Sequence, residues 1–203
     1  MIQLKMENGE WRASEDSPII FNSQLSTFNY RDWVEKKLGE VCNITIGEFV
    51  IKAKQSIGAP YPVYNGGTSN TGFYDEYNNE GNQVIISARG ANAGFVNFEL
   101  GKYWAGNSCY SVSVLNEELY NINFFYYYIK HFENKFTDYQ QAANIPSVSK
   151  KEVSDFKVMI PCIEEQTKIA NFLSTIDEEI DLLEQELEQL QLQKKGLMQG
   201  MFV

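Results

Sequence analysis

The chain has 203 residues, of which 43% are hydrophobic and 14% aromatic. This is enough apolar side chain for one or two domains with a buried core, so disorder throughout is excluded. No run of eighteen apolar residues occurs and the N-terminus has no apolar signal segment, so we expect a cytoplasmic protein without a membrane span. Three distant cysteines and one histidine predict neither a disulfide framework nor a zinc site, so the cysteines are expected to be reduced thiols.

The net charge of −10 is unevenly distributed. Residues 1–41 have five basic and seven acidic side chains, and residues 42–160 have nine and eleven, so each segment carries −2. Residues 161–203 have three and nine, which gives −6. The acidic tail is either a solvated helix face or a surface for a partner. The nearly neutral middle can still bind an anionic ligand where a few cations cluster.

The first 31 residues show no sustained hydrophobic period and are interpreted as a loosely ordered leader. A regular pattern starts at Trp33, because Trp33, Val34, Leu38 and Val41 are spaced as on a short helical turn that ends near Gly39. The folded part of the chain is therefore expected to begin at residue 32.

Two segments in the middle of the chain have the residue pattern of β-strands. VIIS at 84–87 consists mostly of branched apolar residues, which is typical of a buried strand. YSVSV at 110–114 alternates large apolar residues with Ser111 and Ser113, which predicts a strand with one face buried and the serines on the exposed face.

Two polar loops contain glycines where a positive φ is needed, NGGTSNTG at 65–72 and RGANAG at 89–94. Neither matches a phosphate-binding loop. Their amide and hydroxyl groups can hydrogen bond to a ligand, although an ordinary hairpin loop has the same composition.

The next segment contains helix signals. Asn121 can cap a helix with one apolar stripe, made of Ile122, Phe125, Ile129, Phe132 and Phe136. His131 lies beside that stripe without a second histidine, so it is interpreted as a packed or surface residue. Ser149 and Glu152 form a capping box, which predicts a short helix before a KVMI strand and Pro161.

The strongest pattern is a long C-terminal helix from Glu165 to Gln199, about 52 Å long. Apolar residues recur along it at alternating spacings of four and three, with Lys194 at one apolar position, as in a coiled coil. The predicted dimerisation seam consists of Ile169, Leu173, Ile176, Ile180, Leu183, Leu187, Leu190, Lys194, Leu197 and Met201. The helix is too long to be covered by a body of this size.

The sequence shows no pattern of a catalytic site. No two prolines are adjacent, as the base-holding segment of a nucleobase methyltransferase would require, and no G-x-S-x-G accompanies the single histidine. Carboxylates outside the C-terminal helix are scattered, whereas a metal-dependent nuclease needs them to converge. The residues alone therefore predict a binding domain carried on a long helix that seeks a partner.

Several motifs, in order, resemble the specificity subunits of type I restriction-modification enzymes. They are WVEKKLGEV at 33–41, YPVYNGGTSNTGFYDEYNNEG at 61–81, VIISARGANAG at 84–94, NIPSVSKKEVSDFKVMIP at 144–161 and the helical segment from residue 160 onwards. The helical segment is the most specific, with its I-P, E-Q, I-A-x-F-L, D-x-x-I and K-K-G-L-M-Q elements. The resemblance covers nearly everything from Trp33 onwards.

The resemblance implies an α+β fold with three parts: a leader at 1–31, a target-recognition domain at 32–160 and a conserved helical region at 161–203. Members usually have two recognition domains and two helical regions, so this chain resembles a half subunit that pairs with a second copy. It implies no catalysis and no cofactor in this chain. Modification (methyltransferase) subunits would bring S-adenosylmethionine, and restriction subunits would bring ATP and Mg²⁺.

DNA-contacting residues cannot be transferred from the family, because recognition domains differ with their targets. Residue chemistry nominates the side chains that read base edges or bind phosphates in double-stranded DNA. The candidates are Arg89, Lys52, Lys54, Asn65, Thr68, Ser69, Asn70, Asn92, Lys102, Gln140, Gln141, Asn144, Lys150 and Lys151. Arg89 ranks first, as the only arginine after residue 31, although it could instead pair with an acid in a structural turn.

A non-enzymatic glycan- or peptide-binding module on an oligomerising stalk is the alternative function. Loops rich in aromatic and amide side chains suit a sugar as well as a base. The salt dependence of binding to duplex DNA separates the two hypotheses.

Overall fold

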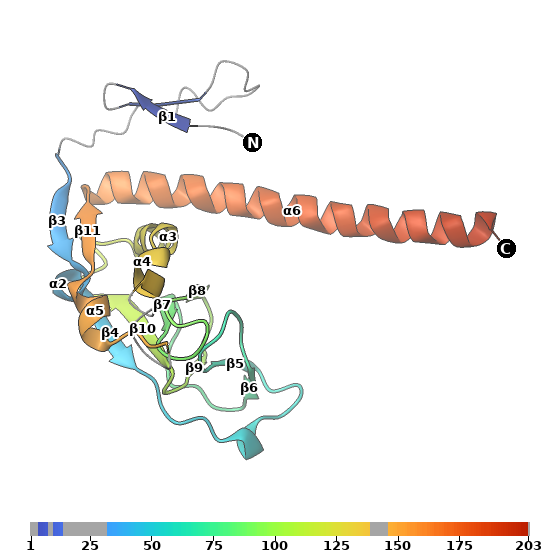
Figure 1. Ribbon diagram of the computed structural model, residues 1–203, viewed down its shortest axis with the longest axis horizontal. Coiled ribbons are helices and arrows are strands. Elements are labelled where there is room, and N and C mark those ends of the chain that lie inside the picture. Colours follow the sequence, from blue (N-terminus) through green and yellow to red (C-terminus); the bar gives the residue numbers. More distant parts are fainter. Residues whose placement is uncertain (1–3, 8–9, 14–31, 139–145, 203) are drawn as a thin grey trace.

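The structure is a computed structural model that describes residues 4–7, 10–13, 32–138 and 146–202. These residues form a mixed domain of sheets and short helices, from which one long helix extends (Figure 1). The predicted α+β class is confirmed. No helix in the described residues is both long and apolar enough to cross a membrane.

A four-stranded antiparallel sheet lies at the centre of the domain, in the order β4–β10–β7–β8. The strands are β4 (Cys42–Ile46), β7 (Gln83–Ser87), β8 (Val96–Glu99) and β10 (Cys109–Val114). The two predicted strands are thus the central pair. Their register places Ser87 opposite Cys109 and Val84 opposite Val112, so the end of β7 lies beside the start of β10.

Helices cover one face of this sheet. They are α2 (Leu38–Val41), α3 (Ile122–His131), α4 (Asn134–Asp138) and α5 (Lys150–Asp155). Phe125 and Ile129 of α3 are fully buried in one core with Val84 and Val112 of the sheet. The predicted caps are confirmed: the Asn121 side chain caps α3, and the Ser149 capping box starts α5.

A smaller three-stranded sheet covers the other face, in the order β6–β5–β9. Its strands are β5 (Tyr61–Tyr64), β6 (Gly72–Tyr74) and β9 (Trp104–Ala105). Tyr103 and Ala105 pack there on Ile85 and Cys109 in a second core. The prediction that Ser111 faces solvent is therefore wrong: Ser111 is buried, and its hydroxyl lies 2.8 Å from that of Tyr103.

Two further local predictions are corrected. The turn predicted from Trp33 is a strand, β3 (Val34–Lys37), which pairs with the predicted KVMI strand β11 (Lys157–Ile160), and helix α2 only follows it. The aromatic stripe is divided between α3 and α4, because the chain leaves the helical conformation at Phe132, although Phe136 is again fully buried.

The predicted leader contains a regular element. Strands β1 (Leu4–Glu7) and β2 (Glu10–Ala13) form an antiparallel pair, which the sequence pattern did not predict. A single 3₁₀ turn, η2 (Lys52–Lys54), lies between β4 and β5.

The long C-terminal helix α6 spans Ile163–Met201, two residues more at each end than predicted. It packs on α3 near its start and then extends well beyond the domain (Figure 1). Its 39 residues correspond to about 58 Å.

Candidate nucleic-acid interface

Loop 65–72 connects β5 to β6 and is held against the end of the central sheet. The backbone N–H of Gly66 donates a hydrogen bond to Cys109 Sγ at 2.9 Å. The hydroxyl of Ser87 donates to the carbonyl oxygen of Gly67 at 2.8 Å. Because both contacts fix loop backbone, the loop is positioned by the two central strands.

The loop touches the residue that ranked first as a DNA contact. Gly66 has a φ of +83°, and a Cβ atom on it would lie 3.2 Å from the carbonyl oxygen of Arg89. A side chain at Gly66 would therefore strain the backbone and crowd Arg89. The structure thus brings together the two polar loops predicted from sequence.

Arg89 lies two residues after the end of β7 and is anchored by its backbone. It forms an isolated antiparallel bridge with Ser147, and the N–H of Gly90 donates to the carbonyl oxygen of Pro146 at 3.0 Å. The Arg89 residue is exposed, and its side chain forms no ion pair with any other residue that the structure describes. A rigid backbone thus presents an available guanidinium to solvent, and no described acid supports the alternative of a structural pair.

A second cation lies near Arg89. Lys150 is exposed at the start of α5, close in sequence to Val148, whose carbonyl oxygen accepts a hydrogen bond from the Tyr110 hydroxyl at 3.2 Å. Burial raises the pKa of Tyr110, and the charge of Arg89 partly opposes that rise. Tyr110 therefore stays neutral beside Arg89. The exposed Lys150 lies three residues after Ser147, the bridge partner of Arg89. Two cations and one acid, Glu152, thus belong to this edge, and their net positive charge favours a negatively charged ligand.

The predicted polar contacts divide into exposed and internal groups. Thr68, Ser69 and Asn92 are exposed and free to turn towards a ligand. Asn65 Oδ1 accepts a hydrogen bond from a backbone N–H at 3.3 Å, and Asn70 Nδ2 donates to a backbone carbonyl at 3.5 Å. The last two side chains are thus partly engaged in shaping the loop.

Most of the remaining predicted lysines are already in exposed ion pairs. The pairs are Lys54 with Glu76 at 3.3 Å, Lys102 with Glu80 at 3.1 Å and Lys151 with Asp155 at 2.6 Å. The pKa of Asp155 is lowered to about 2 by hydrogen bonds from Lys151 and Lys37. Lys52 is exposed on η2. A phosphate would have to compete with the acids for Lys54, Lys102 and Lys151.

Three candidates are not located by the structure. Gln140, Gln141 and Asn144 lie outside the described residues, so their predicted DNA contacts stay predictions. Two residues that hold the backbone of loop 65–72 were not predicted from the sequence, Ser87 and Cys109. Their only signal was position: Ser87 is the last residue of the predicted strand 84–87, and Cys109 directly precedes the predicted strand 110–114.

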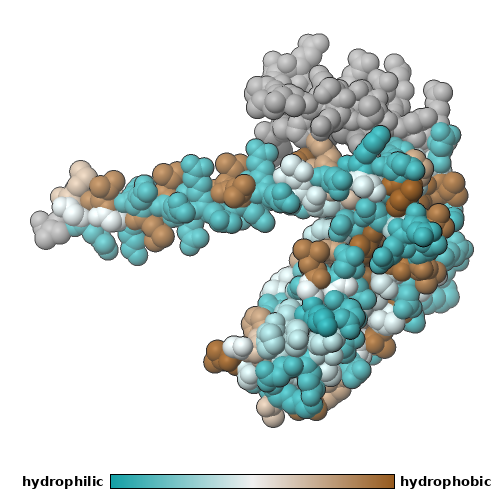
Figure 2. All heavy atoms as spheres, turned by 180° about the vertical axis from the view of Figure 1, so that it is seen from behind, coloured by the Kyte–Doolittle hydropathy of each residue, from teal (hydrophilic) through white to brown (hydrophobic). Residues whose placement is uncertain are grey.

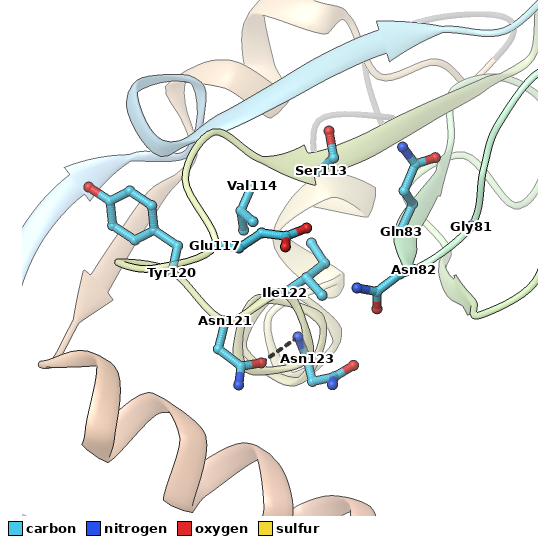
Figure 3. A pocket seen from close by; sticks show the side chains of 10 residues that line it. All are labelled: Gly81, Asn82, Gln83, Ser113, Val114, Glu117, Tyr120, Asn121, Ile122 and Asn123. Atoms are coloured by element: carbon cyan, nitrogen blue, oxygen red, sulfur yellow. Dashed lines mark hydrogen bonds between the residues drawn. The ribbon is translucent and has the colours of Figure 1, made fainter.

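A polar pocket of about 350 Å³ lies at the opposite end of the central strands (Figure 3). It is lined by Gly81, Asn82, Gln83, Ser113, Val114, Glu117, Tyr120, Asn121, Ile122 and Asn123. The lining contains one carboxylate and no lysine or arginine, so it does not suit a polyanion such as DNA.

The single histidine is exposed at the end of α3, where its ring lies 4.5 Å from that of Phe132. This agrees with the interpretation of His131 as a surface residue. Within the described ranges, no three His, Cys, Asp or Glu side chains are grouped as a metal site would need.

Residues 30–192 match the family described as the type I restriction modification DNA specificity domain. The chain belongs to this family. It is 27% identical over 158 residues to a Mycoplasma pneumoniae protein described as a type I specificity subunit, covering 77% of this chain and 42% of that protein. It is 25% identical over 164 residues to the specificity subunit of the type I restriction enzyme EcoDI from Escherichia coli, covering 78% and 34%.

The fold is shared with solved structures of the family. The specificity subunit of Mycoplasma genitalium superposes with a TM-score of 0.72 at 22% identity, over 80% of this chain and 43% of that one. The chain thus spans about half the length of the relatives it matches. This membership confirms the resemblance found in the sequence and gives no support to a glycan- or peptide-binding module.

The predicted dimerisation seam of α6 lies in two different environments. Ile169 packs against the core of its own domain, and Leu173 and Ile176 are half-buried. From Ile180 onwards the seam is uncovered by any described residue: Ile180 is 47% exposed, Leu183 57% and Leu187 55%. Figure 2 shows apolar side chains spaced along the projecting helix. Leu190, Lys194, Leu197 and Met201 continue this exposed series.

Proposed function

We propose that this chain reads one half of a bipartite DNA target for a type I restriction-modification system and holds its methyltransferase subunits. The observation that carries this proposal is the exposed Arg89 beside loop 65–72, with the exposed Lys150 three residues after Ser147, the bridge partner of Arg89. Arginine forms paired hydrogen bonds with guanine in the major groove, and hydroxyl and amide groups read the other base edges. A loop fixed by the central strands presents these groups at defined positions.

The chain itself is proposed to be non-catalytic and to bind no cofactor. The modification subunits would supply S-adenosylmethionine and methylate adenine, and restriction subunits would supply ATP and Mg²⁺. With genomic DNA as the ligand, the chain would act in the cytoplasm.

We propose further that two chains pair through α6. The exposed apolar seam from Ile180 to Met201 needs a partner helix, because exposed leucines at heptad spacing gain free energy when buried. The charges favour antiparallel pairing. Seven acidic residues lie between Asp177 and Glu188, and Lys194 and Lys195 follow them. A parallel pair places like charges together, whereas an antiparallel pair places the lysines near the partner's acids.

The function is tested by reconstituting the chain with its cognate methyltransferase subunits and mapping methylated adenines in a host genome. We expect a bipartite target, and replacement of residues 32–160 by the recognition domain of another member should change the half-sequence. Duplex binding should also weaken steeply as salt increases. A complex that binds DNA no better at low salt than at high salt and methylates no defined sequence would refute the proposal.

A further inference from the structure

A buried glutamine joins α6 to the recognition domain. Gln166 lies in the first turn of α6 and is only 1% exposed. Its Oε1 accepts a hydrogen bond from the backbone N–H of Asn121 at 2.9 Å. Its Nε2 donates to the carbonyl oxygens of Pro161 at 2.9 Å and Leu119 at 3.2 Å. One side chain therefore binds both the segment that leads into α3 and the segment that leads into α6.

Asn121 adds hydrogen bonds to the same joint, which is the contact between the starts of α3 and α6. Its Oδ1 caps α3 by accepting hydrogen bonds from the N–H groups of Asn123 at 2.9 Å and Phe124 at 3.3 Å (Figure 3 shows the first). Its Nδ2 lies 3.4 Å from Thr167 Oγ1 of α6. The starts of the two helices are thus fixed to each other by polar groups.

A second polar contact lies three turns further along α6. The hydroxyl of Tyr127 on α3 donates to Asp177 Oδ2 at 2.8 Å. Partial burial and the neighbouring carboxylate both raise the pKa of Tyr127, so the hydroxyl keeps its proton and remains a donor. Eleven residues separate Gln166 from Asp177, which is about 16 Å along the helix.

These two contacts have a different character from the packing between them. Ala170 is buried and Ile169 is packed on the core, but apolar contacts are non-directional and tolerate small tilts and slides. Hydrogen bonds weaken steeply when their angles change. Two directional contacts about 16 Å apart therefore restrict both the tilt and the rotation of α6.

The remainder of α6 acts as a lever. Every residue from Glu178 to Met201 is exposed in the single chain, so within the described residues no contact with the chain's own domain corrects the direction of this 24-residue segment, which is about 36 Å long. A tilt of about 5° at the joint moves the far end by about 3 Å, which is close to the ~3.4 Å step of one base pair. A small change in the direction of α6 is therefore comparable with a change of one base pair in the gap between the half-sequences.

We infer that Gln166, with the Tyr127–Asp177 pair as a second point, is a positioning residue that sets the direction of α6 and so determines the gap between the two half-sequences. This inference rests on the proposed function for its consequence on DNA. Its structural part, the fixed direction of α6, can be tested without DNA.

The direction of α6 is measured by the distance between spin labels at Asp75→Cys on the domain and Glu188→Cys on the helix, in a Cys162→Ser background. Both label sites are exposed. Labelled chains are diluted with unlabelled chains so that distances within one chain dominate. Gln166→Met keeps the side-chain length and removes the three hydrogen bonds, and Tyr127→Phe removes one hydroxyl. Gln185→Met is the matched control on the exposed helix surface.

We expect a clearly broader distance distribution for Gln166→Met, a smaller broadening for Tyr127→Phe and none for Gln185→Met. In the reconstituted methyltransferase, discrimination between the wild-type gap and a gap one base pair longer should fall about tenfold for Gln166→Met, or about 1.4 kcal/mol. The half-sequences should not change. If Gln166→Met does not fold, Tyr127→Phe alone carries the test.

The outcomes separate the inference from the proposed function. Unchanged distance distributions in a folded variant would overturn the positioning role. A broader distribution with an unchanged gap would overturn its link to the target. If the wild-type complex methylates no defined sequence, the proposed function fails. The spin-label distances still show whether Gln166 fixes the direction of α6.

Discussion

Ser87 and Cys109 are register partners on β7 and β10, and each holds a different backbone group of loop 65–72. The serine donates to the carbonyl oxygen of Gly67, and the cysteine sulfur accepts from the N–H of Gly66. The two side chains therefore act as a clamp that converts the fixed register of the central sheet into a fixed loop beside Arg89.

Removal of one side of the clamp should loosen the loop. Ser87→Ala removes the hydrogen bond to the partly buried carbonyl of Gly67, which we expect to cost about 0.5–1.5 kcal/mol of unfolding free energy, measured in urea. Affinity for the cognate duplex should fall more than affinity for random duplex, since the loop loses its shape but the charges remain. Ser69→Ala, an exposed serine of the same loop, is the matched stability control. Equal stability of the two variants would contradict the clamp.

The cysteines should differ in reactivity. Burial raises the pKa of the Cys42 thiol to about 12 and that of Cys109 to about 11, whereas Cys162 is exposed. Because the thiolate is the nucleophile, the two buried thiols stay protonated and shielded at pH 8. A thiol-reactive maleimide should therefore add once to the folded chain and three times in denaturant, as mass spectrometry can count. Three fast additions to the folded chain would show that the domain opens.

Arg89 should decide DNA affinity more than any other described candidate. Arg89→Ala is expected to weaken cognate binding by about 1–3 kcal/mol if the guanidinium reads a guanine. If it contacts a phosphate, the loss should be nearly equal for cognate and random duplex. Fluorescence anisotropy with both duplexes separates the cases, with Lys102→Ala as a control for a lysine already paired with Glu80. An unchanged affinity for both duplexes would return Arg89 to a structural role.

The sequence predicted elements whose signal is local. Helix α6 was placed to within two residues because its apolar period repeats over many turns, and the caps at Asn121 and Ser149 were recognised because a cap depends on the adjacent residues. Val34–Lys37 was mistaken for helix because its strand partner, β11, lies more than a hundred residues away.

The loops of the candidate site could be predicted from the sequence, but the way in which the fold brings them together could not. The sequence identified loops 65–72 and 89–94, and the sheet register that joins them is a tertiary property. Ser111 was expected to face solvent, because alternation cannot reveal that a second sheet covers the outer face of β10. Gln166 lies in the E-Q element of the helical motif, but its burial could not be predicted, since a glutamine early in a helix usually faces water.

The exposed seam of α6 predicts the association state. Leu183→Asp combined with Leu187→Asp places charge in the middle of the apolar series, where both residues are more than half exposed in the single chain. The double variant should be monomeric with an unchanged thermal midpoint for the domain, because neither side chain contributes to its core. Analytical ultracentrifugation against a Gln185→Asp, Gln189→Asp control off the seam measures this. A double variant that keeps the dimer mass would show that the seam is misassigned.

The length of α6 predicts the target itself. An antiparallel pair related by a two-fold axis presents the same recognition domain to each strand, so the target should be an interrupted palindrome. Deletion of one heptad, Ile180 to Glu186, keeps the seam in phase and shortens the helix by about 10 Å, which is about three base pairs. The gap should shrink while the half-sequences stay the same, as methylated adenines mapped for both complexes would show. Deletion of four residues, Ile180 to Leu183, is the control, because it breaks the heptad phase and should abolish pairing rather than shorten the gap. An asymmetric target, or an unchanged gap in an active heptad-deleted complex, would mean that α6 does not measure the spacing.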